Sequence, residues 1–243
     1  MRLDQMLVAR GLAPSRARAQ DLIRRGFVSV GGYVCNKPAQ DVKEDLLIEI
    51  SSEAPAYVSR GAEKLAAALD RFGFDPSDRV VLDIGASTGG FSEVLLERGV
   101  RRVYAVDVGT AQLHPRLKDD PRVVSLENFD ARMLSDAEVP EPVTAITVDV
   151  SFISVTKLLE PVLQLAASGA WIVVLVKPQF EVGRENVGGG GIVRDEAARQ
   201  SALQGVRDWL AGQSGWTIVG DMTSPILGGS GNIEFVLGAR RND

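Results

Sequence analysis

From residue 80 onward, short apolar strand patterns alternate with helical patterns along the chain. The strand patterns cover residues 80–85, 102–108, 122–127, 145–150, 171–177, 216–222 and 233–239. Helical patterns begin near Phe91, Thr156 and Arg194. Strands that are almost continuously Val, Ile and Leu are typical of parallel sheets buried on both faces by helices. We therefore predict an α/β domain built on a parallel sheet that is covered on both sides.

The first 50 residues follow a different pattern, with two short helices followed by short strands. Ser15 can cap the second helix, Gly26 is placed to end it, and Gly31-Gly32 is a hairpin signal between two strands. The predicted helices cover residues 3–12 and 15–26, and the predicted strands cover residues 27–30, 33–35 and 46–50. This order predicts a small α+β domain.

The two patterns meet in a segment without periodicity. Residues 52–57, with the sequence SEAPAY, contain Pro55 and indicate a linker. We predict an N-terminal domain over residues 1–52, a linker over residues 53–60 and a larger domain over residues 61–243.

The charge of the chain is divided between these two parts. Residues 1–40 contain seven basic and two acidic side chains, a net charge of +5, whereas the whole chain carries −5. The remainder therefore carries −10. A basic arm on an acidic body favours a nucleic-acid partner, although any surface helix can carry arginines. Guanidinium groups on one helix suit contacts with phosphates.

The basic segment also resembles a known RNA-binding module. Residues 15–32, SRARAQDLIRRGFVSVGG, are similar to the small RNA-binding domain of a ribosomal small-subunit protein, pseudouridine synthases and tyrosyl-tRNA synthetases. The resemblance implies an RNA-binding role for this helix, and we add one arginine from the end of the predicted linker. The candidate RNA-binding residues are Ser15, Arg16, Arg18, Arg24, Arg25 and Arg60.

Several classes of protein are disfavoured by what the sequence lacks. Cys35 is the only cysteine and His114 the only histidine, so we expect no internal disulfide, no zinc site and no bound metal. The chain has no apolar run near 18 residues, and Arg2, Asp4 and Arg10 interrupt any signal-peptide pattern. We expect a cytoplasmic protein with no membrane partner.

The first strand of the larger domain leads into a glycine-rich turn. Residues 80–91, VVLDIGASTGGF, lack the GxGxxG spacing of a dinucleotide site. Asp83 before the turn would repel a pyrophosphate but suits a cationic ligand, such as one with an ammonium and a sulfonium group. Asp107, at the end of the next strand, can accept hydrogen bonds from ribose hydroxyls.

This combination resembles class I S-adenosylmethionine-dependent methyltransferases, which have a Rossmann-like fold. The resemblance implies S-adenosyl-L-methionine as the cofactor, with Asp130 in the place of an adenine contact. The candidate cofactor-binding residues are Asp83, Gly85, Ala86, Ser87, Thr88, Gly89, Gly90, Phe91, Asp107 and Asp130.

Four polar residues carry the expected chemistry. Lys64, Asp149, Lys177 and Glu234 occur in the order of the Lys-Asp-Lys-Glu tetrad of FtsJ-like RNA 2′-O-methyltransferases. The segments YVSRGAEKL, DIGASTGGF, TVDVSFISV, KPQFEVGRENVGGGGIVRD and SPILGGSGNIEF resemble the TlyA family of rRNA methyltransferases, historically labelled haemolysins. The resemblance implies methylation of a cytidine 2′-hydroxyl in ribosomal RNA, with Lys177 as the base or as the group that orients the hydroxyl.

The resemblance leaves alternatives open. The chain ends soon after Glu234 and so resembles the shorter relatives restricted to the 23S RNA of the large subunit, which is our expected target. Relatives often have lysine in place of Gly189, so one phosphate contact is expected to be missing. A non-catalytic RNA-binding or ribosome-assembly factor, a methyltransferase for another RNA such as tRNA, and a membrane-lytic haemolysin are the alternatives.

Overall fold

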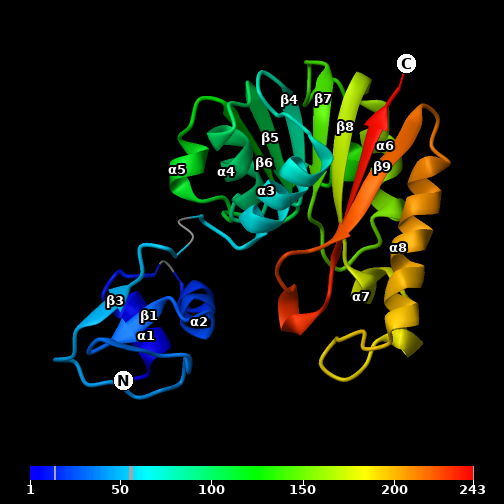
Figure 1. Ribbon diagram of the computed structural model, residues 1–243. Coiled ribbons are helices and arrows are strands. Elements are labelled where there is room, and N and C mark those ends of the chain that lie inside the picture. The colour runs from blue at the N-terminus through cyan, green and yellow to red at the C-terminus, as the bar shows by residue number, and fades with distance from the viewer. Residues whose placement is uncertain (14, 55–56, 243) are drawn as a thin grey trace. The chain divides into compact units, whose positions relative to one another are not determined.

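The computed structural model describes residues 1–13, 15–54 and 57–242 and divides the chain into two compact units (Figure 1). The smaller unit covers residues 1–56 and the larger unit residues 57–243. The division falls within the predicted linker, although Pro55, on which that prediction rests, lies outside the described residues.

The smaller unit consists of two helices packed on a three-stranded antiparallel sheet. Its elements are α1 (Leu3–Ala9), α2 (Arg16–Arg24), β1 (Val28–Val30), β2 (Tyr33–Val34) and β3 (Ile48–Ile50), with the strand order β2-β1-β3. Leu3, Leu7 and Ile23 are completely buried between the helices and the sheet. The α+β prediction is confirmed, with α1 shorter than expected because the chain turns at Gly11, which has a φ of +68°.

The larger unit is built on a seven-stranded sheet with the order β6-β5-β4-β7-β8-β10-β9. Its strands are β4 (Val80–Ile84), β5 (Arg102–Asp107), β6 (Val123–Glu127), β7 (Val143–Val148), β8 (Ala166–Val176), β9 (Trp216–Thr223) and β10 (Phe235–Arg241). The sheet is parallel as predicted except at β10, which runs antiparallel to both β8 and β9. No α-helix separates β9 from β10, so the chain turns back directly.

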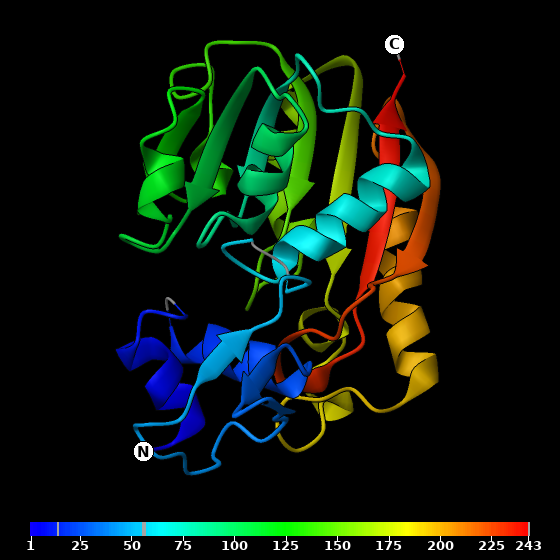
Figure 2. The same ribbon diagram turned by 60° about the vertical axis from the view of Figure 1, so that its left-hand side comes forward.

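Helices cover both faces of this sheet (Figure 2). They are α3 (Gly61–Phe72), α4 (Gly90–Glu97), α5 (Pro115–Lys118), α6 (Thr156–Gln164), α7 (Pro178–Glu181) and α8 (Glu196–Ala211), with short 3-10 turns η1 (Ala131–Met133), η2 (Arg184–Asn186) and η3 (Gly229–Gly231). In β8, Trp171 packs with α3 and α4, whereas Ile172 packs with α6 and α8. Burial of alternate side chains on opposite faces explains why the strands are apolar throughout.

The direction of the strands brings the polar candidates to one edge of the sheet. The parallel strands β4, β5, β7 and β8 end at their carboxyl edge, where Asp107, Asp149 and Lys177 lie. β10 runs the other way and therefore begins at this same edge, immediately after Glu234. Open α/β sheets bind ligands at this edge.

Candidate active site

Two buried ion pairs lie at the carboxyl edge of the sheet. Lys64 Nζ is 2.5 Å from Glu234 Oε2, and Lys177 Nζ is 2.6 Å from Asp149 Oδ1. Lys64 is 7% exposed, Lys177 9% and Glu234 2%, whereas Asp149 is partly exposed. The structure brings the four predicted residues together as two lysine–carboxylate pairs. Each charge is compensated by a partner, which makes burial of the pairs tolerable.

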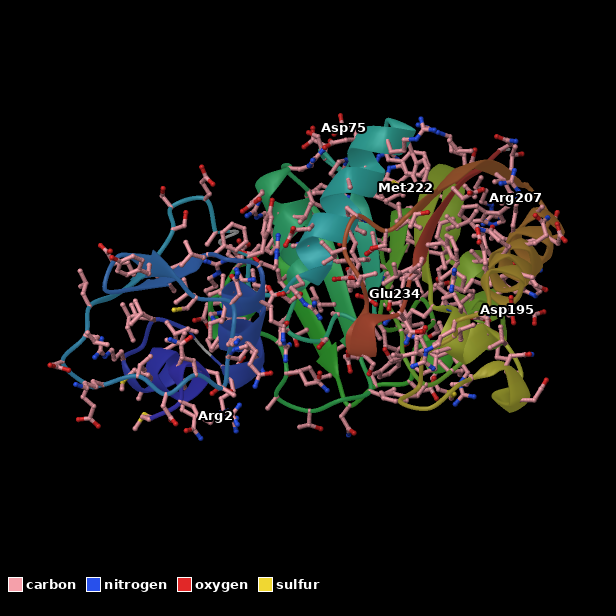
Figure 3. The ribbon with its side chains drawn as sticks, turned by 60° about the horizontal axis from the view of Figure 1, so that its bottom comes forward. Arg2, Asp75, Asp195, Arg207, Met222 and Glu234 are labelled. Atoms are coloured by element: carbon pink, nitrogen blue, oxygen red, sulfur yellow. The ribbon has the colours of Figure 1, made fainter. Side chains whose placement is uncertain are left out.

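Glu234 is positioned by the pairing of strands and by one glycine. Phe235 is opposite Val176 in the β8–β10 ladder, so Glu234 lies just beyond the strand, opposite Lys177. Glu234 is labelled in Figure 3. A Cβ atom at Gly228 would lie within 2.2 Å of the Glu234 carboxyl carbon. Any side chain at position 228 would force this carboxylate to move from its place beside Lys64. Gly228 is visible in the sequence, in the run SPILGG, but its contact with Glu234 is visible only in the structure.

Ser151 was not among the predicted site residues. Lys177 Nζ donates a hydrogen bond of 2.8 Å to Ser151 Oγ. Ser151 follows Asp149 by two residues in the loop after β7, and its side chain is exposed. Its place in the segment TVDVSFISV, beside a candidate catalytic aspartate, was the available signal.

A cavity of about 280 Å³ opens over the ion pairs. Besides the four paired residues, its wall consists of Ser59, Arg60, Gly61, Gly85, Ala86, Ser87, Thr88, Gly90, Phe91 and Ser151. A second cavity of about 470 Å³ lies beside the ends of β4 and β5. Its wall consists of Ile84, Gly85, Ser87, Val106–Val108, Gln112, Phe129–Arg132, Asp149–Ile153 and Leu158. Gly85, Ser87, Asp149 and Ser151 line both cavities, so the two share a border.

The glycine-rich turn forms the floor between the cavities. Gly85 has a φ of +80°, and a Cβ atom there would lie 2.6 Å from the carbonyl oxygen of Asp149. A side chain is therefore excluded twice, by backbone conformation and by space. Ser87 N donates to Asp107 Oδ2 at 2.8 Å, and Gly109 N donates to Asp107 Oδ1 at 2.7 Å. Asp107 thus holds the turn in place while it lines the second cavity.

Two of the ten predicted cofactor residues do not reach either cavity. The Asp83 carboxylate is completely buried and accepts hydrogen bonds from Ser92 Oγ at 2.6 Å and Thr147 Oγ1 at 2.9 Å. Burial raises its pKa to about 6. Gly89 faces Leu113 and Leu117 instead. The direct contact expected between Asp83 and a cationic ligand is therefore not available in this arrangement, and Asp83 instead connects β4 with α4 and β7.

Asp130 lies on the wall of the second cavity, as the predicted adenine contact requires. The Arg132 side chain donates to its carboxylate, with Nη2 2.5 Å from Oδ2, and holds the pKa of Asp130 at about 2. The carboxylate therefore stays charged across the physiological range.

Family models match both units. Residues 57–241 match FtsJ-like methyltransferase, and residues 1–48 match the S4 domain. The chain belongs to the FtsJ-like methyltransferase family. The predicted class I methyltransferase fold is thereby confirmed, and S-adenosylmethionine is the methyl donor.

Three relatives extend along nearly the whole chain. The 16S/23S rRNA (cytidine-2'-O)-methyltransferase TlyA of Mycobacterium tuberculosis is 45% identical, over 98% of this chain and 89% of its own length. The 23S rRNA (cytidine-2'-O)-methyltransferase TlyA of Campylobacter jejuni is 35% identical, over 97% of both. A solved structure under the name hemolysin, from Streptococcus thermophilus, is 37% identical with a TM-score of 0.77, covering 100% of this chain and 89% of that one.

The two bordering cavities fit the donor of an FtsJ-like methyltransferase. A donor in the second cavity would have the Gly85 turn beneath it and Asp107 and Asp130 on its wall. Because Gly85 has no side chain, its backbone can be approached closely by a ligand at the border of the two cavities, beside Asp149. Lys64, Asp149, Lys177 and Glu234 lie on the wall of the adjoining cavity.

The predicted RNA-binding residues are divided between the two units. Ser15 Oγ caps α2 by accepting from Arg18 N, and Arg24 is exposed on α2. Arg16 pairs with the buried Asp4 at 3.0 Å, and Arg18 and Arg25 pair with Asp21. Arg60 lines the smaller cavity of the methyltransferase unit.

Two further features concern the described residues only. No helix in the described part of the chain is long and apolar enough to cross a lipid bilayer. Residues 1–13, 15–54 and 57–242 contain no cluster of three or more His, Cys, Asp or Glu side chains arranged to hold a metal ion.

Proposed function

We propose that this protein transfers a methyl group from S-adenosylmethionine to the 2′-hydroxyl of a cytidine in ribosomal RNA. The observation that carries the proposal is the pair of buried lysine–carboxylate ion pairs in a cavity that borders a second, larger cavity at Gly85. The relatives from Mycobacterium tuberculosis and Campylobacter jejuni, which are named as rRNA cytidine 2′-O-methyltransferases, support the same acceptor.

The chemistry requires alignment more than activation. S-adenosylmethionine supplies an electrophilic methyl carbon on a good, neutral leaving group. A ribose hydroxyl is a poor nucleophile, so the protein has to hold it in line with that carbon and give its proton a path. Lys177, held by Asp149 and Ser151, would orient the hydroxyl oxygen by donating to one of its lone pairs. Glu234 would fix the position of Lys64 on the opposite wall.

An aromatic pair supports a nucleotide as the acceptor. Phe152 is 92% exposed and has a φ of +68°, a conformation that is costly for an aromatic residue. The centre of its ring lies 5.3 Å from that of the Phe180 ring. Phe152 comes three residues after Asp149, and Phe180 comes three residues after Lys177. An exposed ring at the edge of the cavity offers a stacking surface for a base, a contact worth about 1–3 kcal/mol.

The smaller unit would supply RNA affinity. It matches the S4 domain, and α2 presents Arg24 to solvent. Residues 1–40 carry a net charge of +5, which suits phosphates. Arg60, at the entrance to α3, would contribute from the methyltransferase unit. An rRNA substrate also supports a cytoplasmic location.

We infer that the large-subunit 23S RNA is the target, because it is common to the names of both curated relatives. The test is to supply donor with a labelled methyl group to separated ribosomal subunits and to tRNA, with wild type and Lys177→Met. We expect label in large-subunit RNA from the wild type and at least a 100-fold lower rate from the variant.

Other outcomes would change the conclusion in defined ways. Label only in small-subunit RNA or tRNA would keep the methyltransferase and overturn the target. Binding of RNA without methyl transfer to any of the three would support a non-catalytic assembly factor. Release of haemoglobin from erythrocytes by the purified protein at nanomolar concentration would support the haemolysin alternative.

A further inference from the structure

Ser151 occupies a distinctive place in the methyltransferase unit. It lines both cavities, its side chain is exposed, and its Oγ accepts a hydrogen bond of 2.8 Å from Lys177 Nζ. An accepted hydrogen bond leaves a serine hydroxyl with one further lone pair and with its own proton to donate. Ser151 can therefore accept a second hydrogen bond and donate one at the same time.

The reaction at this site releases one proton, and the two lysines are poor acceptors for it. Each is paired with a carboxylate at 2.5–2.6 Å, and an ammonium group has donors but no lone pair. Asp149 could take the proton only by giving up its charge, which would leave the Lys177 cation buried without a counter-ion. A neutral hydroxyl that is open to water has neither disadvantage.

We propose that Ser151 is a catalytic residue that carries the proton of the ribose hydroxyl to solvent. This rests on the proposed 2′-O-methylation. As the bond between the ribose oxygen and the methyl carbon forms, the electron pair of the carbon–sulfur bond stays on sulfur. The O–H bond of the ribose breaks and its proton moves to Ser151 Oγ. The original seryl proton passes to water, so Ser151 is unchanged and one proton is released.

Ser154 provides a matched control in the same loop. Its Oγ donates to Glu181 Oε2 at 2.6 Å and it lines neither of the two site cavities. Ser151→Ala removes the relay, Ser151→Thr keeps a hydroxyl, and Ser154→Ala removes a hydroxyl from the same loop without touching the site. Because Ser151 is exposed, none of its substitutions disturbs the apolar core.

The experiment measures single-turnover methyl transfer to RNA in H₂O and in D₂O, with donor and RNA saturating. Donor affinity is measured separately by calorimetry, and the side-chain ammonium signal of Lys177 is followed by NMR in the protein alone. We expect Ser151→Ala to lower the rate by about 10–100-fold, because general acid–base groups contribute about 10²–10⁴-fold and water can partly replace a hydroxyl. Ser151→Thr should recover most of the rate.

Three further results are expected if the proton passes through Ser151. The wild-type rate should be slower in D₂O, and this isotope effect should change in Ser151→Ala. Donor affinity should stay within twofold of wild type in all variants. The Lys177 signal should shift in Ser151→Ala, where it loses a hydrogen-bond acceptor, and should be unchanged in Ser154→Ala.

The inference would be overturned in three ways. The first is a rate for Ser151→Ala within twofold of wild type. The second is a loss of donor affinity large enough to account for the slower rate, which would make Ser151 a donor contact. The third is a slower rate with an isotope effect equal to that of wild type, which would leave Ser151 only as a support for Lys177. If the wild type itself methylates no RNA, the proposed function fails instead.

Discussion

Lys64→Met is the substitution whose effect on stability can be estimated most directly. Lys64 is 7% exposed and its partner Glu234 only 2%, with 2.5 Å between Nζ and Oε2. Removal of one partner from a buried ion pair leaves an uncompensated charge and costs about 3–5 kcal/mol of unfolding free energy. For a unit of this size, each kcal/mol lowers Tm by about 2–4 °C, so a fall of roughly 6–20 °C is expected.

The double variant Lys64→Met/Glu234→Gln should recover most of that loss, because no charge then remains buried. It should nevertheless be inactive, which separates stability from catalysis. Urea unfolding followed by tryptophan fluorescence is the suitable assay, since Trp171, Trp209 and Trp216 all belong to the larger unit. Asp70→Asn is the control, because Asp70 pairs with Arg98 at an exposed position and should contribute less than about 1 kcal/mol.

Two results would refute this reasoning. One is a loss in Lys64→Met no larger than that in Asp70→Asn. The other is a double variant no more stable than the single one, which would mean that the methylene groups of Lys64, rather than its charge, provide the stability.

Three other substitutions test separate parts of the structure. Gly85→Ala should weaken donor binding at least about tenfold, because its Cβ would lie 2.6 Å from the Asp149 carbonyl oxygen. Gly99→Ala is the control, since Gly99 has a similar φ of +79° and its Cβ would meet only Ser77 Oγ at an ordinary contact distance of 3.7 Å. It should cost about 1–2 kcal/mol of stability and leave donor affinity unchanged in calorimetry. Folding raises the pKa of Asp83 from 3.8 to about 6, so the folded state binds the extra proton and stability should fall by about 2 kcal/mol as pH rises from 4 to 6. This decline should be absent from urea unfolding of Asp83→Asn, and an identical pH profile in that variant would contradict it. Arg24→Ala should lower the slope of log affinity for RNA against log salt by about one without changing stability, and an unchanged slope would remove Arg24 from the RNA interface.

The positions of the strands could be predicted because their composition follows from burial on both faces. The direction of β10 could not, because it depends on the connection from β9 rather than on the residues of either strand. That direction is what brings Glu234 to the same edge as Lys177. The sequence order of the four polar residues predicted a common site through family resemblance, whereas the choice of partners, Lys64 with Glu234 across 170 positions, depends on the packed fold.

The burial of Asp83 has a physical reason in the strand on which it lies. Val81 and Asp83 are two positions apart in β4, so their side chains lie on the same face of the sheet. Val81 packs in the apolar cluster that includes residues of α3 and α4. Period-two alternation therefore directs Asp83 beneath α4, toward Ser92, and away from the cavities. Ser151 was missed because its place two residues after Asp149 does not by itself show that Lys177 lies beside it.

The start of the longest helix was predicted at Arg194 and lies two residues later. Asp195 Oδ1 accepts from Ala197 N at 3.0 Å and caps the first turn, so α8 begins at Glu196. A carboxylate before a helical run is a capping signal that the sequence already contained.

The most direct test of 2′-O-methylation identifies the atom that receives the methyl group. Large-subunit RNA methylated by the wild type is digested to nucleosides, and the methylated nucleoside is identified by mass spectrometry with fragmentation of the glycosidic bond. We predict a cytidine with its extra mass on the ribose fragment, absent when Lys177→Met replaces the wild type. Extra mass on the base fragment, or equal yield from Lys177→Met, would contradict a 2′-hydroxyl reaction that depends on these ion pairs.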